Sequence, residues 1–104
     1  MNESEIFRAL ADPTRRAVFE RLLAGEKNAT ELREGLAISQ PAVSQHIAVL
    51  RGAGLVSEAR VGRNVNYSVN PDGFAPLFDW LSRYREFWPH RVDRLKKLLR
   101  EIDQ

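Results

Sequence analysis

The apolar positions in the first half of the chain recur at the three- and four-residue spacing of amphipathic helices. Ile6, Phe7 and Leu10 predict a short first helix. The Asp-Pro pair at 12–13 supplies a capping side chain followed by a proline suited to a first helical turn. A second helix is therefore expected from there to Gly25, which ends it.

Two further helix starts follow at short intervals. Asn28 and Glu31 have the spacing of a capping box and predict a short third helix. Ser39 can accept hydrogen bonds from the amides of a new first turn, and Pro41 within that turn costs little because its missing N–H would be unpaired there. The fourth helix should run to about Gly52.

Beyond these helices the pattern changes from helical to extended. Residues 55–61 and 65–69 form two strand-like runs, and the second alternates with period two. A short turn containing Gly62 separates them, which predicts a β-hairpin. Its tip carries Arg60 and Arg63 and should project beyond the body of the domain.

A long helical segment is expected over about residues 72–103, kinked or split by Pro89 near Trp88. Its apolar residues exceed one stripe, because Trp80 and Phe87 lie on other faces. A helix so widely apolar in a small domain is usually covered by another chain. We therefore expect one face to pack on the domain and the other on a symmetry-related copy.

Length and composition fit one domain, residues 1–104, around one core. The chain is 43% apolar and 29% charged, as in globular proteins, and no apolar stretch approaches the roughly 18 residues that cross a bilayer. The acidic start does not resemble a secretion signal, so we expect a cytoplasmic protein without membrane contact. Because the chain lacks cysteine and a Gly-rich phosphate loop, we expect neither an enzyme nor a cofactor.

The net charge of +2 is too small to identify a partner, but the charge is unevenly distributed. Residues 1–38 carry six basic and seven acidic side chains, whereas residues 39–70 carry three arginines and one glutamate. Residues 71–104 carry seven basic and six acidic side chains. A polyanion would therefore be tolerated best against the middle third of the chain.

The predicted fourth helix has an uncharged polar face. Its apolar residues Val43, Ile47 and Leu50 fall in one narrow sector and should pack inward. A solvent-facing helix would normally be rich in lysine and glutamate, whereas small and amide-bearing side chains suit a major groove about 12 Å wide. This polar face comprises Gln40, Pro41, Ser44, Gln45 and Ala48.

These residue types match the chemistry of double-stranded DNA. Gln40 and Gln45 can pair with adenine, and Ser44 can donate or accept at a base edge. The arginines are candidates for phosphate contacts, and the position of His46 predicts a partly buried hydrogen-bonding or phosphate-contacting side chain. The candidate DNA-binding residues are Ser39, Gln40, Pro41, Ser44, Gln45, His46, Ala48, Arg51, Arg60 and Arg63, with Arg15 and Arg16 as further phosphate candidates.

The order of elements predicts a mainly α fold with a β-hairpin wing, a winged helix-turn-helix. Residues 9–16 (ALADPTRR) and 39–56 (SQPAVSQHIAVLRGAGLV), together with Arg60, Arg63 and Tyr67, closely resemble the ArsR-type winged-helix transcriptional regulators. The resemblance extends over essentially the whole chain. It implies a homodimeric repressor that binds a palindromic operator, is released by an inducer and dimerises through its first and last helices.

The candidate dimer residues follow from this implication and from the apolar C-terminal segment. They are Ile6, Phe7, Leu77, Trp80, Leu81, Tyr84, Phe87, Trp88, Val92 and Leu95. The identity of an inducer is left open. A winged helix that contacts only proteins is the alternative, and it would show no salt-dependent duplex binding.

The chain departs from the metal-sensing members of the family it resembles. No cysteine precedes the predicted fourth helix, and Leu81 stands where one family site has a histidine. His90 and Asp93 keep a half-match at helical spacing, and two ligands from each subunit of a dimer could form a four-ligand zinc site. A divalent-metal-responsive repressor is thus a second alternative, although we expect His90 to be solvated or interfacial and the chain to hold no metal.

Overall fold

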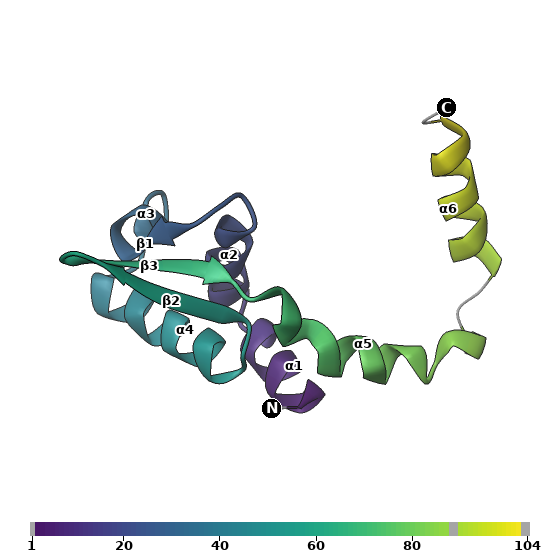
Figure 1. Ribbon diagram of the computed structural model, residues 1–104, viewed down its shortest axis with the longest axis horizontal. Coiled ribbons are helices and arrows are strands. Elements are labelled where there is room, and N and C mark those ends of the chain that lie inside the picture. Colours follow the sequence, from purple (N-terminus) through teal and green to yellow (C-terminus); the bar gives the residue numbers. More distant parts are fainter. Residues whose placement is uncertain (1, 88–89, 103–104) are drawn as a thin grey trace.

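The computed structural model describes residues 2–87 and 90–102. Helices surround one side of a small antiparallel sheet, and the C-terminal segment leads away from this body (Figure 1). The elements of the body are α1 (Glu3–Ala11), α2 (Pro13–Leu22), β1 (Lys27–Asn28), α3 (Ala29–Arg33), α4 (Gln40–Gly52), β2 (Val56–Val61) and β3 (Asn64–Val69). The predicted mainly α fold with a hairpin wing is confirmed.

Side chains start the helices where the sequence predicts them. Asp12 Oδ1 accepts the backbone N–H of Arg15 at 2.9 Å and caps α2. Asn28 and Glu31 form a reciprocal capping box, with bonds of 2.8 and 3.0 Å between each side chain and the other's backbone N–H. Each cap satisfies amides that would otherwise lack an intrahelical partner, which fixes the start of its helix.

The sheet has the strand order β1-β3-β2, with antiparallel pairing throughout. Strands β2 and β3 form the predicted hairpin, called the wing below, with Val61 opposite Asn64. Its turn has Gly62 at a φ of 65°, a backbone region that favours glycine. The third strand, β1, pairs Lys27 with Tyr67 and was not predicted, because two residues are too few to show alternation.

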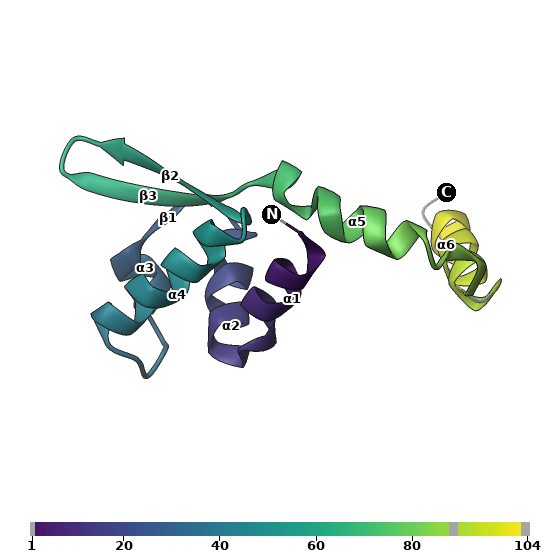
Figure 2. The ribbon, with the colours of Figure 1, turned by 90° about the horizontal axis from the view of Figure 1, so that it is seen from below.

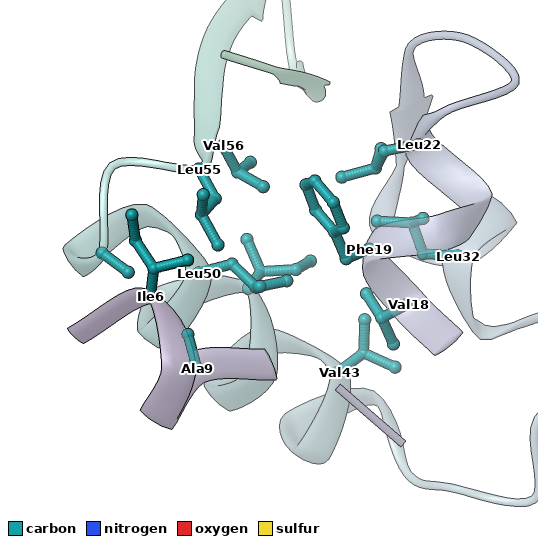
Figure 3. Packing of buried hydrophobic residues seen from close by; sticks show 12 residues of the cluster. Ile6, Ala9, Val18, Phe19, Leu22, Leu32, Val43, Leu50, Leu55 and Val56 are labelled. Carbon is teal, nitrogen blue, oxygen red and sulfur yellow. The ribbon is translucent and has the colours of Figure 1, made fainter. Parts of the chain in front are cut away.

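The core gathers side chains from α1, α2, α3, α4 and the start of β2 (Figure 3). Val43, Ile47 and Leu50 are buried, which confirms the predicted inward face of α4. The buried apolar set is Ile6, Ala9, Val18, Phe19, Leu22, Leu32, Val43, Ile47, Leu50, Ala53, Leu55 and Val56. Burial of α4 between the other helices and the wing orients its opposite face outward.

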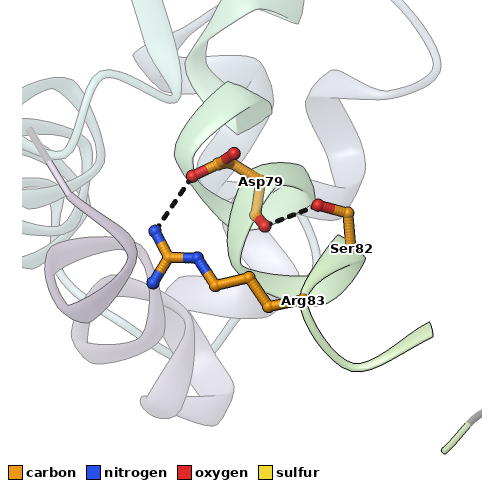
Figure 4. A network of polar contacts seen from close by, with 3 residues as sticks. All are labelled: Asp79, Ser82 and Arg83. Atoms are coloured by element: carbon orange, nitrogen blue, oxygen red, sulfur yellow. Dashed lines mark hydrogen bonds and ion pairs between the residues drawn. The ribbon is translucent and has the colours of Figure 1, made fainter. Parts of the chain in front are cut away.

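The C-terminal segment is divided into η1 (Pro71–Phe74), α5 (Ala75–Ser82), η2 (Arg85–Phe87) and α6 (His90–Ile102). Within this segment, α5 thus ends at Ser82, well before the break that was predicted near Trp88. The Ser82 hydroxyl donates to the Asp79 carbonyl at 2.7 Å (Figure 4). The Arg83 amide donates to the Trp80 carbonyl, three residues back, instead of to Asp79. This three-residue bonding tightens the final turn and ends the helix.

Helix α6 stands away from the body in both views of the ribbon (Figures 1 and 2). The radius of gyration is 16.6 Å, compared with about 13 Å for a compact chain of this length. Trp88 and Pro89 lie outside the described residues, and so does the kink predicted there. Among the helices of the described ranges, none has the length and apolar character that crossing a bilayer requires.

Candidate nucleic-acid interface

The polar face of α4 is open to solvent. Pro41, Ser44, Gln45 and Ala48 are exposed, and Gln40 is half-buried at the first turn. The helix starts at Ser39, whose hydroxyl accepts the Ala42 amide at 3.2 Å. No acidic side chain belongs to α4, so its outer surface offers hydrogen-bonding and small apolar groups without negative charge.

Two arginines hold the turn that leads into α4. The Arg33 side chain donates to the Ile38 carbonyl at 2.8 Å, and the Arg21 guanidinium bonds to the Glu34 carbonyl. Both bonds satisfy backbone oxygens in the connection between α3 and α4. They therefore fix where α4 begins. These positioning residues were not among the predicted site residues, because each contact joins side chain to backbone outside a helical repeat.

The wing extends beyond the helices, as expected (Figure 2). Arg60 and Arg63 are exposed near its turn, on either side of Gly62. Neither arginine belongs to an ion pair found within residues 2–87 and 90–102. Two guanidinium groups at the end of an antiparallel hairpin provide donors for phosphate oxygens.

Arg51 lies in the last turn of α4 and forms an ion pair with Glu58 of β2, with Nη1 and Oε2 3.0 Å apart. Both side chains are about two-fifths exposed, at 45% and 38%. An open groove runs between the two elements, and Ala48 from the polar face lines it together with Ser57. The predicted phosphate ligand Arg51 thus has a carboxylate partner within the chain.

Arg15 and Arg16 bind the end of α1. The Arg15 guanidinium donates to the carbonyls of Ala9 and Arg8, the latter at 3.1 Å, and Arg16 donates to the Leu10 carbonyl at 2.9 Å. These bonds satisfy carbonyls at a helix C-terminus and place positive charge there, which is favourable. A guanidinium has five N–H donors, so their role as phosphate ligands stays a prediction.

His46 is half-buried, as predicted. The backbone amide of Arg15 lowers the pKa of Asp12 below its usual value of 3.8. Desolvation opposes this shift, and the charge of His46 adds a lowering that is smaller than either effect. The imidazole on α4 therefore acts electrostatically on the carboxylate that caps α2.

The predicted dimer residues divide into two groups. Phe7 packs edge-on against Trp80 with ring centroids 5.1 Å apart, and Trp80 packs on Tyr84 at 4.8 Å. Phe7, Tyr84 and Phe87 are exposed by 45%, 43% and 76%, whereas Leu77 and Leu81 are half-buried. The four aromatic residues of this group, Phe7, Trp80, Tyr84 and Phe87, are exposed or half-buried and are called the aromatic surface below.

One predicted dimer residue needs correction. Ile6 is completely buried in the core of its own protomer, so it offers no side-chain surface to a second copy. It supports α1 from within while Phe7 points outward. Trp88 lies outside the described residues, and so do the side chains of Val92 and Leu95.

A metal site is not assembled from the part of the chain that the structure describes, where no three His, Asp or Glu side chains come together. The side chains of His90 and Asp93 are outside that part, so the half-match in the sequence is not tested.

This chain is similar to known transcriptional regulators in sequence and to a solved structure in fold. A family model described as a helix-turn-helix domain matches residues 10–59, which include α2, α3 and α4. The HTH-type transcriptional regulator Rv2034 of Mycobacterium tuberculosis (strain ATCC 25618 / H37Rv) is 41% identical over 89% of this chain and 84% of its own length. The transcriptional repressor SdpR of Bacillus subtilis (strain 168) is 31% identical over 78% of this chain and 90% of its own.

A solved structure supports the same relationship. The crystal structure of an ArsR family transcriptional regulator matches with a TM-score of 0.74 and 34% sequence identity. The match covers 82% of this chain and 93% of the other. Similarity of both sequence and fold over most of two chains reaches well beyond the helix-turn-helix unit alone.

Proposed function

Since the chain belongs to the ArsR family of winged helix-turn-helix transcriptional regulators, we propose that it is a repressor that reads operator DNA with α4 and holds the DNA backbone with its wing. The observation that carries this proposal is the pairing of an exposed, uncharged face on α4 with exposed arginines at the wing tip. Such an arrangement separates base reading from phosphate binding. We assign the chain no catalytic step, and we place its action in the cytoplasm.

Base reading falls to the N-terminal half of α4. Gln40 and Gln45 carry amides that can donate to and accept from adenine at once, and Ser44 lies between them on the exposed face. Ala48 leaves room for a base edge or contacts a thymine methyl group. Ser39, Pro41 and His46 border this region and complete the proposed contact surface.

Phosphate binding falls to the arginines. Arg60 and Arg63 are exposed on the wing. Arg51 stands at the far end of α4, where a phosphate would have to compete with Glu58 for it. Arg15 and Arg16 have remaining donors beyond those used on α1. Each phosphate that these side chains neutralise should add to the salt dependence of binding.

The regulator is proposed to act as a homodimer on a palindromic site. The aromatic surface, which extends from α1 along α5 to η2, supports this, because exposed aromatic side chains in a small domain favour burial against a second copy. A twofold axis would present two α4 helices to half-sites one helical turn, or about 34 Å, apart.

Selection of bound fragments from the source genome would identify the operator, which a gel-shift titration can then use. Gln45→Ala should selectively weaken binding to the operator, by about 1–3 kcal/mol of binding free energy for each base that the side chain no longer reads. Arg63→Ala should weaken operator and random duplex alike and reduce the salt slope by about one for each phosphate that is no longer neutralised. If both variants bind as the parent does, the proposed contacts are wrong.

A protein-binding winged helix would behave differently in the same titration. It would show no salt-dependent affinity for any duplex, and a stable complex with another protein would replace DNA binding. That result would overturn the proposed repressor function as a whole.

A further inference from the structure

The ion pair between Arg51 and Glu58 joins two elements of the candidate DNA surface. Arg51 is in the last turn of α4, and Glu58 is on β2, opposite Tyr67 of β3. Both backbones are held by regular hydrogen bonding, so the carboxylate faces the guanidinium at 3.0 Å without distortion of either element. The pair lines the groove that Ala48 also lines, directly beside the polar face of α4.

Glu58 is unusual in its sequence context. It is the single acidic residue between Ser39 and Asn70, the stretch that contains α4 and the wing. A carboxylate near DNA is unfavourable because the phosphates repel it. In this fold, the one carboxylate of the stretch lies against an arginine that could otherwise bind a phosphate.

We propose that Glu58 restrains DNA binding by occupying Arg51, so that it limits the part of the affinity that does not depend on base sequence. The inference rests on the proposed function. A phosphate that approaches Arg51 must displace the Glu58 carboxylate and then accept it as a negatively charged neighbour. Arg51 therefore contributes little net attraction, whereas Arg60 and Arg63 contribute fully.

The partial exposure of the pair makes this exchange feasible. At 45% and 38% exposure, both side chains are in contact with water, and such ion pairs are worth only about 0–1 kcal/mol. A phosphate can thus compete with Glu58 for Arg51. Because the ion pair with Glu58 must be broken first, most of the binding free energy of the new Arg51–phosphate contact is lost. Removal of the carboxylate should leave Arg51 free to bind the phosphate.

The isosteric substitution Glu58→Gln tests the proposal, with fluorescence anisotropy of a labelled random-sequence duplex over a series of NaCl concentrations. We expect the variant to bind about five- to tenfold more tightly at about 0.1 M salt, and its salt slope to steepen by about 0.9 for each protomer whose Arg51 then binds a phosphate. The double variant Glu58→Gln/Arg51→Gln should not show this tighter binding, because the effect requires the freed guanidinium.

Asp79→Asn is the matched control. Asp79 also pairs with an arginine, Arg83, at 3.1 Å (Figure 4). This pair lies at the C-terminal end of α5, away from α4 and the wing (Figure 1). This variant removes the same charge and should change affinity far less than Glu58→Gln. A uniform effect of net charge would instead make the two variants equal and would overturn the inference.

The remaining outcomes are distinguishable. If the parent binds duplex DNA but Glu58→Gln binds equally or more weakly with an unchanged salt slope, Glu58 does not restrain Arg51 and the inference fails alone. If the parent shows no salt-dependent duplex binding, the proposed function fails and the inference fails with it.

Discussion

Gly73 lies so close to Gly54 that a Cβ at residue 73 would stand 2.0 Å from the Gly54 carbonyl oxygen. The Asn70 side chain donates to the same oxygen at 2.9 Å, and the Asn70 amide bonds to the Leu55 carbonyl at 2.9 Å. The turn that follows α4 is thereby joined to the segment that starts α5. Helix α4 and the aromatic surface are thus parts of one connected framework.

This close approach predicts that Gly73→Ala destabilises the protein. The added methyl group would meet backbone atoms, which cannot rotate away, so we expect a loss of about 3 kcal/mol in the free energy of unfolding. Gly52→Ala is the control, because a Cβ there meets nothing within 4 Å and alanine favours a helix over glycine by about 0.5–1 kcal/mol. Urea unfolding of both variants checks this, and equal stability of the two would contradict the close approach.

The cap of α2 predicts a dependence of stability on acid. The pKa of Asp12 is lowered on folding, chiefly by the Arg15 amide, so the carboxylate stabilises the fold above its usual pKa of 3.8 and ceases to do so as pH falls through the lowered value. Asp12→Asn keeps a capping oxygen but does not titrate. The parent should therefore be more stable than Asp12→Asn at neutral pH. The difference between their unfolding free energies should shrink as the pH is lowered below 3.8.

A difference between parent and Asp12→Asn that stays constant into acid would show that the carboxylate charge does not stabilise the cap.

Arg15 and Arg63 should differ in how much they contribute to the stability of the fold. Its bonds to the Ala9 and Arg8 carbonyls tie α2 to the end of α1, so Arg15→Gln should lower stability by about 1–2 kcal/mol. Arg63→Gln removes an exposed wing side chain and should change stability by less than about 0.5 kcal/mol. Thermal unfolding measures both. A destabilised Arg63 variant beside an unaffected Arg15 variant would contradict these placements.

The aromatic surface predicts the oligomeric state. Trp80 packs on both Phe7 and Tyr84, and truncation of a central interface aromatic typically costs about 2 kcal/mol or more. Trp80→Ala should therefore weaken dimerisation at least about thirtyfold in sedimentation experiments. Leu23→Ala is the control, because Leu23 is 63% exposed at the C-cap of α2 and is not one of the four residues of this surface. An unchanged dimer in the Trp80 variant would exclude the aromatic surface as the interface.

The fold could be predicted in large part because its signals are local. The caps at Asp12, Asn28 and Ser39 each lie within three residues of the amide that they bind. The pairing of β1 with β3 could not be predicted, since it joins Lys27 to Tyr67, far apart along the chain. The early end of α5 depends on the Ser82 hydroxyl, a competition with the backbone that apolar spacing does not reveal.

The candidate site shows the same division. The outward face of α4 followed from helical spacing alone, because Val43, Ile47 and Leu50 identify the buried side. The partner of Arg51 could not be predicted in this way, since an ion pair between α4 and β2 depends on the tertiary arrangement. Burial of Ile6 beside the exposed Phe7 likewise reflects how α1 is rotated against the core, which one short apolar run does not determine.

The central claim is that α4 and the wing form the DNA-contacting surface, and amide chemical-shift mapping of isotope-labelled protein titrated with operator DNA tests it most directly. We expect the largest changes to fall on residues 39–48 and on the wing around Gly62, with much smaller changes over α5. Changes concentrated on α5 or α6, with the amides of α4 unaffected, would contradict it.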